Sequence, residues 1–293
     1  MKIKKMLIFI IMAIVFAGCE SGFEDMMDDV ETVENSVSYN DNGATGGSIP
    51  VDNTIYKTGD TVTVLLNSGS LKKIPTAGTG EAFKFGGWNT KADGSGISYI
   101  AGSGTFVFDT AIILYAKWVK FELRDRGPAN GWIFHDKGSY SGGWRYLEAA
   151  PEDISGTYAW KTSATDTPGT STAIGTGYAN TYTYMTGPEH PAAEVVRNAA
   201  YGGYTGWFLP SKDELNEMCW VLNSMKWNYP ANLSENNPAY GDNRVGDFAG
   251  NYWSSYRTHF AEPQAYYQSF GNGYQTVATQ HGLYFNVRAV RAF

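Results

Sequence analysis

The chain has 293 residues, of which 43% are hydrophobic and 15% aromatic, so it holds enough apolar material for the cores of two ordinary domains. Its formal net charge is −7, and removal of the three lysines at positions 2, 4 and 5 would make it −10. A negative charge of this size argues against nucleic acid or an anionic membrane surface as a partner.

The first 18 residues have the layout of a secretory signal. Three lysines form a cationic start, residues 6–16 are an unbroken apolar run, and Ala17 and Gly18 precede Cys19. A membrane-spanning helix is the competing interpretation, but eleven residues at about 1.5 Å each cover roughly 16 Å, whereas a bilayer core measures about 30 Å. The run is too short to span, so residues 1–18 are predicted to be a signal peptide.

Cys19 would then be the first residue of the mature chain. The order of residues resembles the bacterial lipobox, with Phe16 where leucine is more usual, and this resemblance implies acylation of Cys19. Acyl chains contribute about 0.8 kcal/mol per buried CH₂, so two or more chains hold a protein stably on a bilayer. We therefore expect an extracytoplasmic protein, lipid-anchored to the bacterial membrane at the cell surface. With Cys19 acylated, Cys219 has no intramolecular partner, and no disulfide framework is predicted.

Residues 19–36 are predicted to be an acidic tether. Between Glu20 and Asn35 there are seven carboxylates and no basic residue, a composition that repels itself and offers little to bury. A short helix over residues 23–30 is the alternative.

Residues 37–119 have a different character. β-branched or aromatic runs at 60–66, 105–108 and 111–118 are separated by glycine-rich turns, a pattern typical of short strands in a small sheet. Trp88 and Trp118 lie within or at the end of such runs, so we expect them to pack in the core or on the sheet and not to act as ligand platforms. The sequence Asp93-Gly-Ser-Gly is interpreted as a hairpin turn, because one carboxylate cannot build a calcium site.

Four strings in this stretch resemble the Listeria–Bacteroides repeat, the internalin B-repeat type. The strings are Tyr39-Asn-Asp-Asn-Gly43, Tyr56-Lys-Thr-Gly-Asp60-Thr-Val-Thr-Val64, Phe85-Gly-Gly-Trp-Asn-Thr-Lys-Ala-Asp-Gly-Ser-Gly96 and Leu114-Tyr-Ala-Lys-Trp118. The resemblance implies a small β-grasp-like β module that serves as a stalk or spacer in surface proteins. Additional residues near 76–82 depart from the repeat and are predicted to lengthen one loop.

Residues 120–293 form the larger unit, which opens with strand-like runs at 131–135 and 144–148. A helix is predicted over 192–200, where apolar residues recur at helical spacing before two glycines. A second helix is predicted after Ser211, a candidate N-cap with Glu214 as its capping-box partner. One face of this helix carries four apolar residues, Leu215, Met218, Cys219 and Leu222. Cys219 is therefore expected in the core.

The last part of the chain is predicted to consist of a long loop followed by strands. The asparagine-rich stretch 228–251 is longer than a simple connection needs. Strand-like runs follow at 252–256, 265–270 and 284–293, and Trp253 and Phe270 are expected in the core. The order of strands, helices and strands predicts an α+β domain whose last strand returns beside the first.

Three strings in this unit resemble the domain of unknown function 1566, also called the Legionella collagen-like protein C-terminal domain. The strings are Gly206-Trp-Phe-Leu-Pro-Ser-Lys-Asp-Glu-Leu215, Tyr252-Trp-Ser-Ser255 and Val287-Arg-Ala-Val-Arg291. The resemblance implies a C-type-lectin-like α+β domain over residues 120–293 and, in some relatives, binding of sulfated glycans or other surface polymers.

Residues that flank the last loops are candidate ligand contacts, because an aromatic face beside hydrogen-bonding arms is typical of sites for polar ligands. Ordinary surface display is the alternative for each of them. The sequence Glu262-Pro-Gln264 is similar to the loop with which calcium-dependent lectins hold a sugar, but the Trp-Asn-Asp sequence expected downstream is missing. The candidate ligand-binding residues are Tyr256, Arg257, His259, Glu262, Gln264, Tyr266, Tyr274 and Gln275.

Patterns typical of catalysis are missing from the sequence. The four histidines are far apart and form no metal-binding pair, and no nucleophile elbow, P-loop or dinucleotide fingerprint is present. We therefore predict that the chain is not an enzyme and has neither a metal site nor another cofactor. Calcium is left open by the Glu262-Pro-Gln264 sequence, which does not by itself support it.

These observations predict a cell-surface lipoprotein that presents a lectin-like domain for adhesion or recognition. Its expected partners are the membrane, through the lipid anchor, and an extracellular glycan or a host or matrix protein, with no role for nucleic acid. A structural envelope or assembly component without a soluble ligand is the alternative, and an enzyme of unknown reaction comes third.

Overall fold

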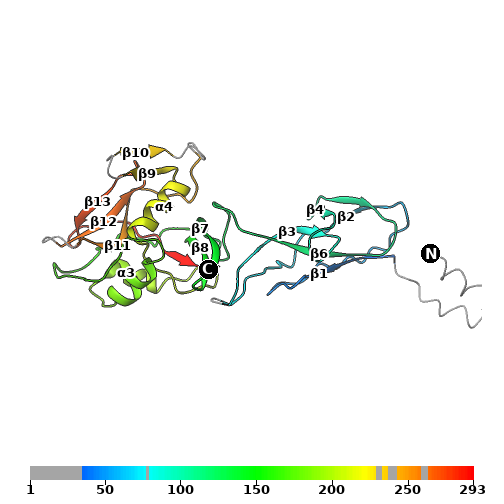
Figure 1. Cartoon of the computed structure of the whole chain (residues 1–293), viewed down its shortest axis with the longest axis horizontal. Coiled ribbons are helices and arrows are strands. Elements are labelled where there is room, and N and C mark those ends of the chain that lie inside the picture. The colour runs from blue at the N-terminus through cyan, green and yellow to red at the C-terminus, as the bar shows by residue number, and fades with distance from the viewer. Residues whose placement is uncertain (1–34, 77–78, 229–232, 237–242, 259–262) are drawn as a thin grey trace, which may run out of the picture.

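The computed structural model of the chain describes residues 35–76, 79–228, 233–236, 243–258 and 263–293. These residues form a mixed α+β structure, mostly strands in several small sheets with three short helices. Figure 1 shows two lobes arranged end to end, with the C-terminus at the side of the second lobe that faces the first. None of the helices in the described part of the chain has the length and hydrophobicity needed to cross a bilayer. The predicted signal peptide, Cys19 and nearly all of the acidic tether lie outside the described residues.

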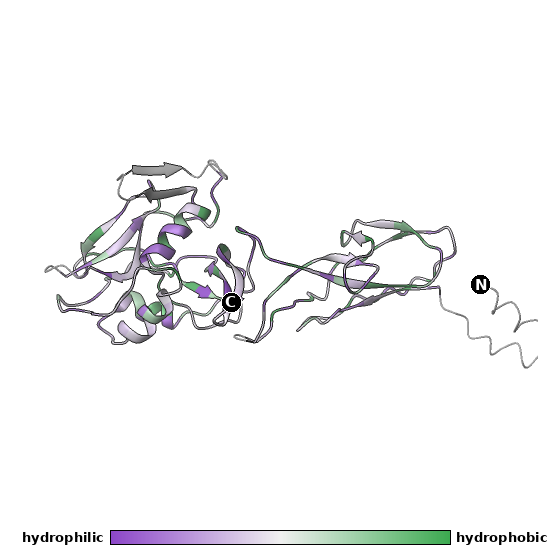
Figure 2. Cartoon of the chain, viewed as in Figure 1, coloured by the Kyte–Doolittle hydropathy of each residue, from purple (hydrophilic) through white to green (hydrophobic). Residues whose placement is uncertain are grey.

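The first lobe is built from six short strands, and no helix occurs in its described residues. The strands are β1 (Val37–Asn40), β2 (Thr61–Thr63), β3 (Lys84–Asn89), β4 (Ser98–Tyr99), β5 (Thr105–Val107) and β6 (Ile112–Val119). Four of them form a sheet in the order β1-β6-β3-β4, in which β1 runs parallel to β6, and β2 pairs with β5 in a second sheet. Figure 2 shows β6 as a largely hydrophobic strand, as expected for the strand between two neighbours.

The core of this lobe lies between the two sheets. Trp88 and Leu114 are fully buried and pack with Val62 from the second sheet and with Phe108, which directly follows β5. The prediction that Trp88 is a core residue is therefore confirmed. Trp118 is only partly buried and packs edge-on against Phe85 at 6.1 Å between ring centroids, so one part of its ring is left at the surface.

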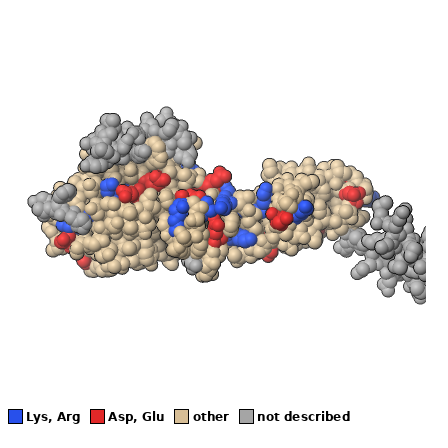
Figure 3. Space-filling model, viewed as in Figure 1, with Lys and Arg blue, Asp and Glu red and all other residues tan. Residues whose placement is uncertain are grey.

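The described end of the segment that was predicted to lengthen one loop, residues 79–82, contacts the second lobe. Its Glu81 pairs with Arg145 at 2.5 Å, and Arg145 also pairs with Asp136 at 2.7 Å. At the end of the loop Lys84 pairs with Asp125, and Ala82 packs in a small apolar cluster of the second lobe. Figure 3 shows charged residues of both signs where the two lobes meet. We call this set of contacts the joint.

The second lobe combines two sheets, one hairpin and the helices. Its elements are β7 (Trp132–Ser141), β8 (Trp144–Ala149), α2 (Gly177–Ala179), a π-helical turn (Asn180–Tyr184), α3 (Pro191–Arg197), α4 (Lys212–Leu222), β9 (Met225–Asn228), β10 (Leu233–Asn236), β11 (Asn251–Arg257), β12 (Gln264–Ser269), β13 (Gln275–Thr279) and β14 (Val290–Ala292). The strands order as β14-β8-β7 and β11-β12-β13, and β9 pairs with β10. The expected long loop at 228–251 therefore contains a strand, and the expected strand at 284–293 is regular only over β14.

The chain closes the second lobe by bringing its end back to the opening hairpin. β14 pairs antiparallel with β8, the second strand of that hairpin. The sequence had predicted that the last strand would lie beside the first strand of the domain. Two arginines of the last segment anchor the closure, because Arg291 pairs with the buried Glu148 and Arg288 pairs with Asp153. A buried arginine needs such a partner, since an uncompensated charge in the interior costs several kcal/mol, roughly 3–5.

Helix α4 begins as the sequence predicts. The hydroxyl of Ser211 accepts from the backbone N–H of Glu214 at 3.2 Å, and the Glu214 carboxylate accepts from the backbone N–H of Ser211 at 2.6 Å. Cys219 is buried on the apolar face of this helix, and burial raises the pKa of its thiol to about 12. The capping box and the core position of Cys219 are both confirmed.

Candidate functional site

The strands β11 and β12 carry most of the candidate ligand residues. They pair antiparallel with an irregularity between Trp253 and Arg257, which places extra residues of β11 opposite β12. Within this bulge the hydroxyl of Ser254 donates to the carbonyl of Tyr266 at 3.0 Å and accepts from the backbone N–H of Tyr256 at 3.2 Å. A buried serine thus ties the two tyrosines together through their backbones.

The rings of Tyr256 and Tyr266 lie side by side and are partly exposed. Their centroids are 5.6 Å apart and the ring planes differ by 32°. The ammonium of Lys212, in the first turn of α4, lies 5.5 Å from the Tyr266 ring and 3.0 Å from the Asp213 carboxylate. We call these four residues the tyrosine–lysine face. It combines flat apolar surface with a cation and an anion, an arrangement that suits a ligand with both C–H and hydroxyl groups.

Gln275 lies behind this face, in the interior of the lobe. Its side chain is buried, and its amide donates to the backbone carbonyl of Lys212 at 2.8 Å. The strand β13, on which it lies, pairs with β12 and so fixes the distance between the sheet and α4. In this structure Gln275, a predicted ligand residue, holds the helix start in place.

Arg257, the last residue of β11, is also buried. It forms an ion pair with Asp166, and its backbone N–H donates to Thr170 at 3.2 Å. Both partners come from a loop about ninety residues earlier in the chain. Its guanidinium is therefore engaged in holding that loop against the sheet.

The two remaining described candidates lie at or just before the starts of strands. Gln264 starts β12 and its carbonyl accepts from the backbone of Thr258 at 3.0 Å. Tyr274 lies in the turn before β13 and is 36% exposed. His259 and Glu262 lie outside the described residues, so the Glu262-Pro-Gln264 sequence is described only from Pro263 onward.

A buried polar chain lies near the Arg257 side of β11. Lys161 donates to the hydroxyl of Thr167 at 2.9 Å, and this hydroxyl lies 2.9 Å from Nε2 of His190. Because a hydroxyl can donate one hydrogen bond and accept two, either tautomer of the His190 ring satisfies this contact. Burial lowers the pKa of His190 to about 4, aided by the charge of Lys161, so the ring is neutral at pH 7. All three side chains are at most 4% exposed, which keeps this arrangement out of reach of a substrate.

The strings of sequence that resemble a known domain supply the interior of this lobe. Trp207, Trp253 and Val287, one from each string, meet in one core cluster. Trp253 and Phe270 are buried as predicted. These strings therefore explain the shape of the lobe more than the chemistry of its surface.

Sequence reasoning missed Lys212 and Asp213 as members of the face. The signal that locates them is the N-cap at Ser211, because the residues that follow an N-cap form the exposed first turn of a helix. Within the described ranges, no group of three or more His, Cys, Asp or Glu side chains is placed to hold a metal ion.

No protein-family model matches the chain, and no curated protein matches it significantly.

Proposed function

We propose that the chain is a cell-surface lipoprotein whose residues 120–293 recognise an extracellular glycan or a host or matrix protein through the tyrosine–lysine face. The observation that carries this proposal is the fixed geometry of Tyr256 and Tyr266, which share the Ser254 hydroxyl through their backbones and lie beside the Lys212–Asp213 pair. Rigid tyrosines lose little conformational entropy on binding and expose both apolar and polar surface. No catalytic step is assigned to the chain.

The proposal includes a finer view of both lobes. The parallel pairing of β1 with β6 supports a β-grasp-like module of the Listeria–Bacteroides repeat type, which acts as a spacer. The pairing of β14 with β8 supports a C-type-lectin-like domain related to the Legionella collagen-like C-terminal domain, in which the chain ends are joined. The end-to-end arrangement in Figure 1 suits a spacer that holds a recognition domain away from the membrane.

Binding of the purified chain to a glycan array and to immobilised matrix proteins tests the proposal. Tyr256→Ala and Tyr266→Ala should each weaken saturable binding about thirtyfold, since an aromatic residue at the centre of an interface contributes roughly 2 kcal/mol. Tyr284→Ala is the matched control, because Tyr284 is 62% exposed and lies outside the face. Equal losses in all three variants would contradict the proposal.

The alternative function is a structural envelope component without a soluble ligand. The charged and apolar contacts of the joint favour it, because they stiffen the connection between the lobes in the way that an assembly component requires. If the correctly folded protein bound no glycan on the array and no matrix protein, this alternative would be favoured.

The proposed anchor is tested separately from the ligand. Mass spectrometry of the membrane-extracted protein should find acyl groups on the N-terminal Cys19, and Cys19→Ser should release the protein from the membrane fraction. An unmodified Cys19 in a cytosolic protein would overturn the surface location.

A further inference from the structure

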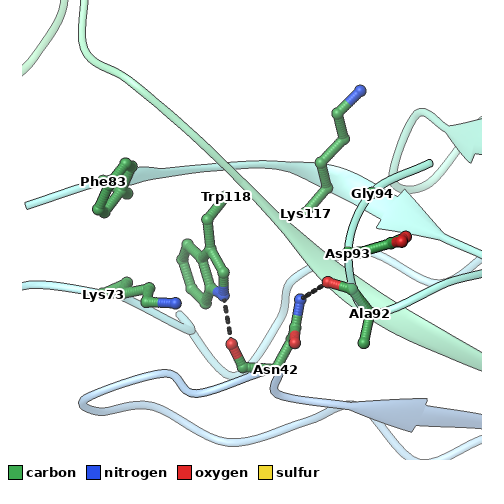
Figure 4. Close-up of a pocket in the computed structure, with 8 residues that line it drawn as sticks. All are labelled: Asn42, Lys73, Phe83, Ala92, Asp93, Gly94, Lys117 and Trp118. Atoms are coloured by element: carbon green, nitrogen blue, oxygen red, sulfur yellow. Dashed lines mark hydrogen bonds between the residues drawn. The ribbon is translucent and has the colours of Figure 1, made fainter.

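A pocket in the first lobe lies apart from the tyrosine–lysine face. Its volume is about 390 Å³, within the range of small-molecule sites. Figure 4 shows that its lining side chains come from segments that are far apart in the sequence. The residues that matter for the argument are Asn42, Lys73, Phe83, Asp93, Lys117 and Trp118.

The indole of Trp118 is held in a fixed orientation on one wall. Its ring nitrogen donates to the backbone carbonyl of Asn42 at 2.9 Å. The side chain of Asn42 in turn donates to the carbonyls of Ala92 and Ala116, at 2.8 and 2.9 Å. Since the polar edge of the indole is already bonded, the ring offers its apolar face to whatever enters the pocket.

Lys73 supplies a cation next to this aromatic wall. It pairs with Phe83 through an isolated β-bridge, at the base of the lengthened loop. Its ammonium lies 5.8 Å from the Trp118 ring centroid and 6.0 Å from that of Phe83, at the outer limit of a cation–π contact. Among the described residues, no carboxylate lies within ion-pair distance of Lys73, so no described acid balances its charge.

The opposite side of the pocket carries both an acceptor and a second cation. Asp93 is exposed, and hydrogen bonds from Ser95 hold the pKa of its carboxyl below the usual value, so it is ionised. Lys117 donates to the hydroxyl of Ser98 at 3.0 Å. The side chains around the pocket therefore include two cations and one anion.

We propose that this pocket binds an acidic saccharide, with a uronate ring stacked on Trp118, its carboxylate paired with Lys73 and its hydroxyls donating to Asp93. An aromatic carboxylic acid would satisfy Trp118 and Lys73 but would bring no hydroxyl to Asp93, and a neutral sugar would bring no anion to Lys73. A uronate carries the acid and the hydroxyls on one ring of suitable size. This site gives the spacer lobe a binding role of its own, independent of the function proposed for the second lobe.

The test uses the full mature chain and isothermal titration with trigalacturonate as the probe and a neutral galactose trisaccharide for comparison. Wild-type protein should bind the acidic probe at least tenfold more tightly than the neutral one, and sodium chloride should weaken the acidic complex. Lys73→Gln should weaken trigalacturonate binding about tenfold, the loss expected for one charge-assisted hydrogen bond. Lys72→Gln is the matched control, because Lys72 is the exposed neighbour and does not line the pocket.

Three results would overturn the proposal: no saturable binding of the acidic probe, equal binding of the two trisaccharides, or equal losses in the two lysine variants. The comparison of probes on wild-type protein decides the question even where Lys73→Gln does not fold. Tyr266→Ala should leave trigalacturonate binding unchanged, which separates this site from the tyrosine–lysine face.

Discussion

The buried His190 makes a prediction about how stability depends on pH. Its ring contacts Thr167 through Nε2, packs edge-on to Trp160 at 5.5 Å, and is 2% exposed. The charges that act on it are those of Lys161 and Arg197, which lower its pKa, and of Glu189, which raises it. Burial has the largest effect, and the resulting pKa of about 4 lies well below the ordinary histidine value of 6.5.

The sign of the effect follows from proton binding in the two states. Between pH 6.5 and pH 4 the unfolded chain binds a proton at this histidine and the folded chain does not, so folding stability falls as the pH falls through this window. For these two pKa values, the free energy of unfolding falls by at most about 2.5 kcal/mol between pH 7 and pH 4.5. Glu214 opposes this trend, since burial raises its pKa to about 7, and the wild-type slope alone is therefore not diagnostic.

Urea unfolding at pH 7 and pH 4.5 of wild-type protein and His190→Gln isolates the effect. The glutamine stays neutral at both pH values. The free energy of unfolding of the variant should therefore fall by up to about 2.5 kcal/mol less than that of wild type between pH 7 and pH 4.5, whatever the stability of the variant at pH 7. His135→Gln is the matched control for the loss of a histidine, because the His135 side chain is partly exposed and lies outside the buried chain of Lys161, Thr167 and His190. Identical pH dependence in wild type and His190→Gln would refute the reasoning.

Two further predictions concern stability and shape. Glu214→Gln should lower the free energy of unfolding in urea by about 1–3 kcal/mol, because the Glu214 carboxylate accepts from the backbone N–H groups of Gly175 and Ser211. The control Asp213→Asn should lower it by under about 1 kcal/mol. Equal effects of the two substitutions would argue against the capping box. Arg145→Gln should loosen the joint and broaden the interlobe distance distribution in small-angle X-ray scattering, with Lys120→Gln as control. An unchanged profile would show that the apolar contacts hold the joint alone.

Local features of this fold could be predicted from the sequence. The capping box of Ser211 and Glu214 depends on residues three positions apart, and the apolar face with Cys219 follows from helical spacing. The hairpin turn at Asp93 is equally local, since its carboxylate accepts from the N–H of Ser95 two residues later. Each of these features depends only on residues that are close together in the sequence.

Features set by distant parts of the chain could not be predicted. Arg257 was expected at a ligand and is buried because Asp166 meets it from a remote loop. Gln275 is buried because β13 brings it under the start of α4. The Trp118 pocket was missed for the same reason, since its walls come from segments that only the folded lobe assembles. The polar side chains of Arg257 and Gln275 suggested contact with a polar ligand. The fold instead brings a polar group of the protein to each of them.

The central claim, that the second lobe recognises its ligand at the tyrosine–lysine face, is tested most directly by hydrogen exchange of the full chain. The measurement compares exchange with and without a saturating amount of the glycan or matrix protein selected on the arrays. The account predicts slower exchange in peptides of β11, β12 and the first turn of α4, around Tyr256, Tyr266 and Lys212. Slower exchange elsewhere in the chain, with these peptides unchanged, would contradict it.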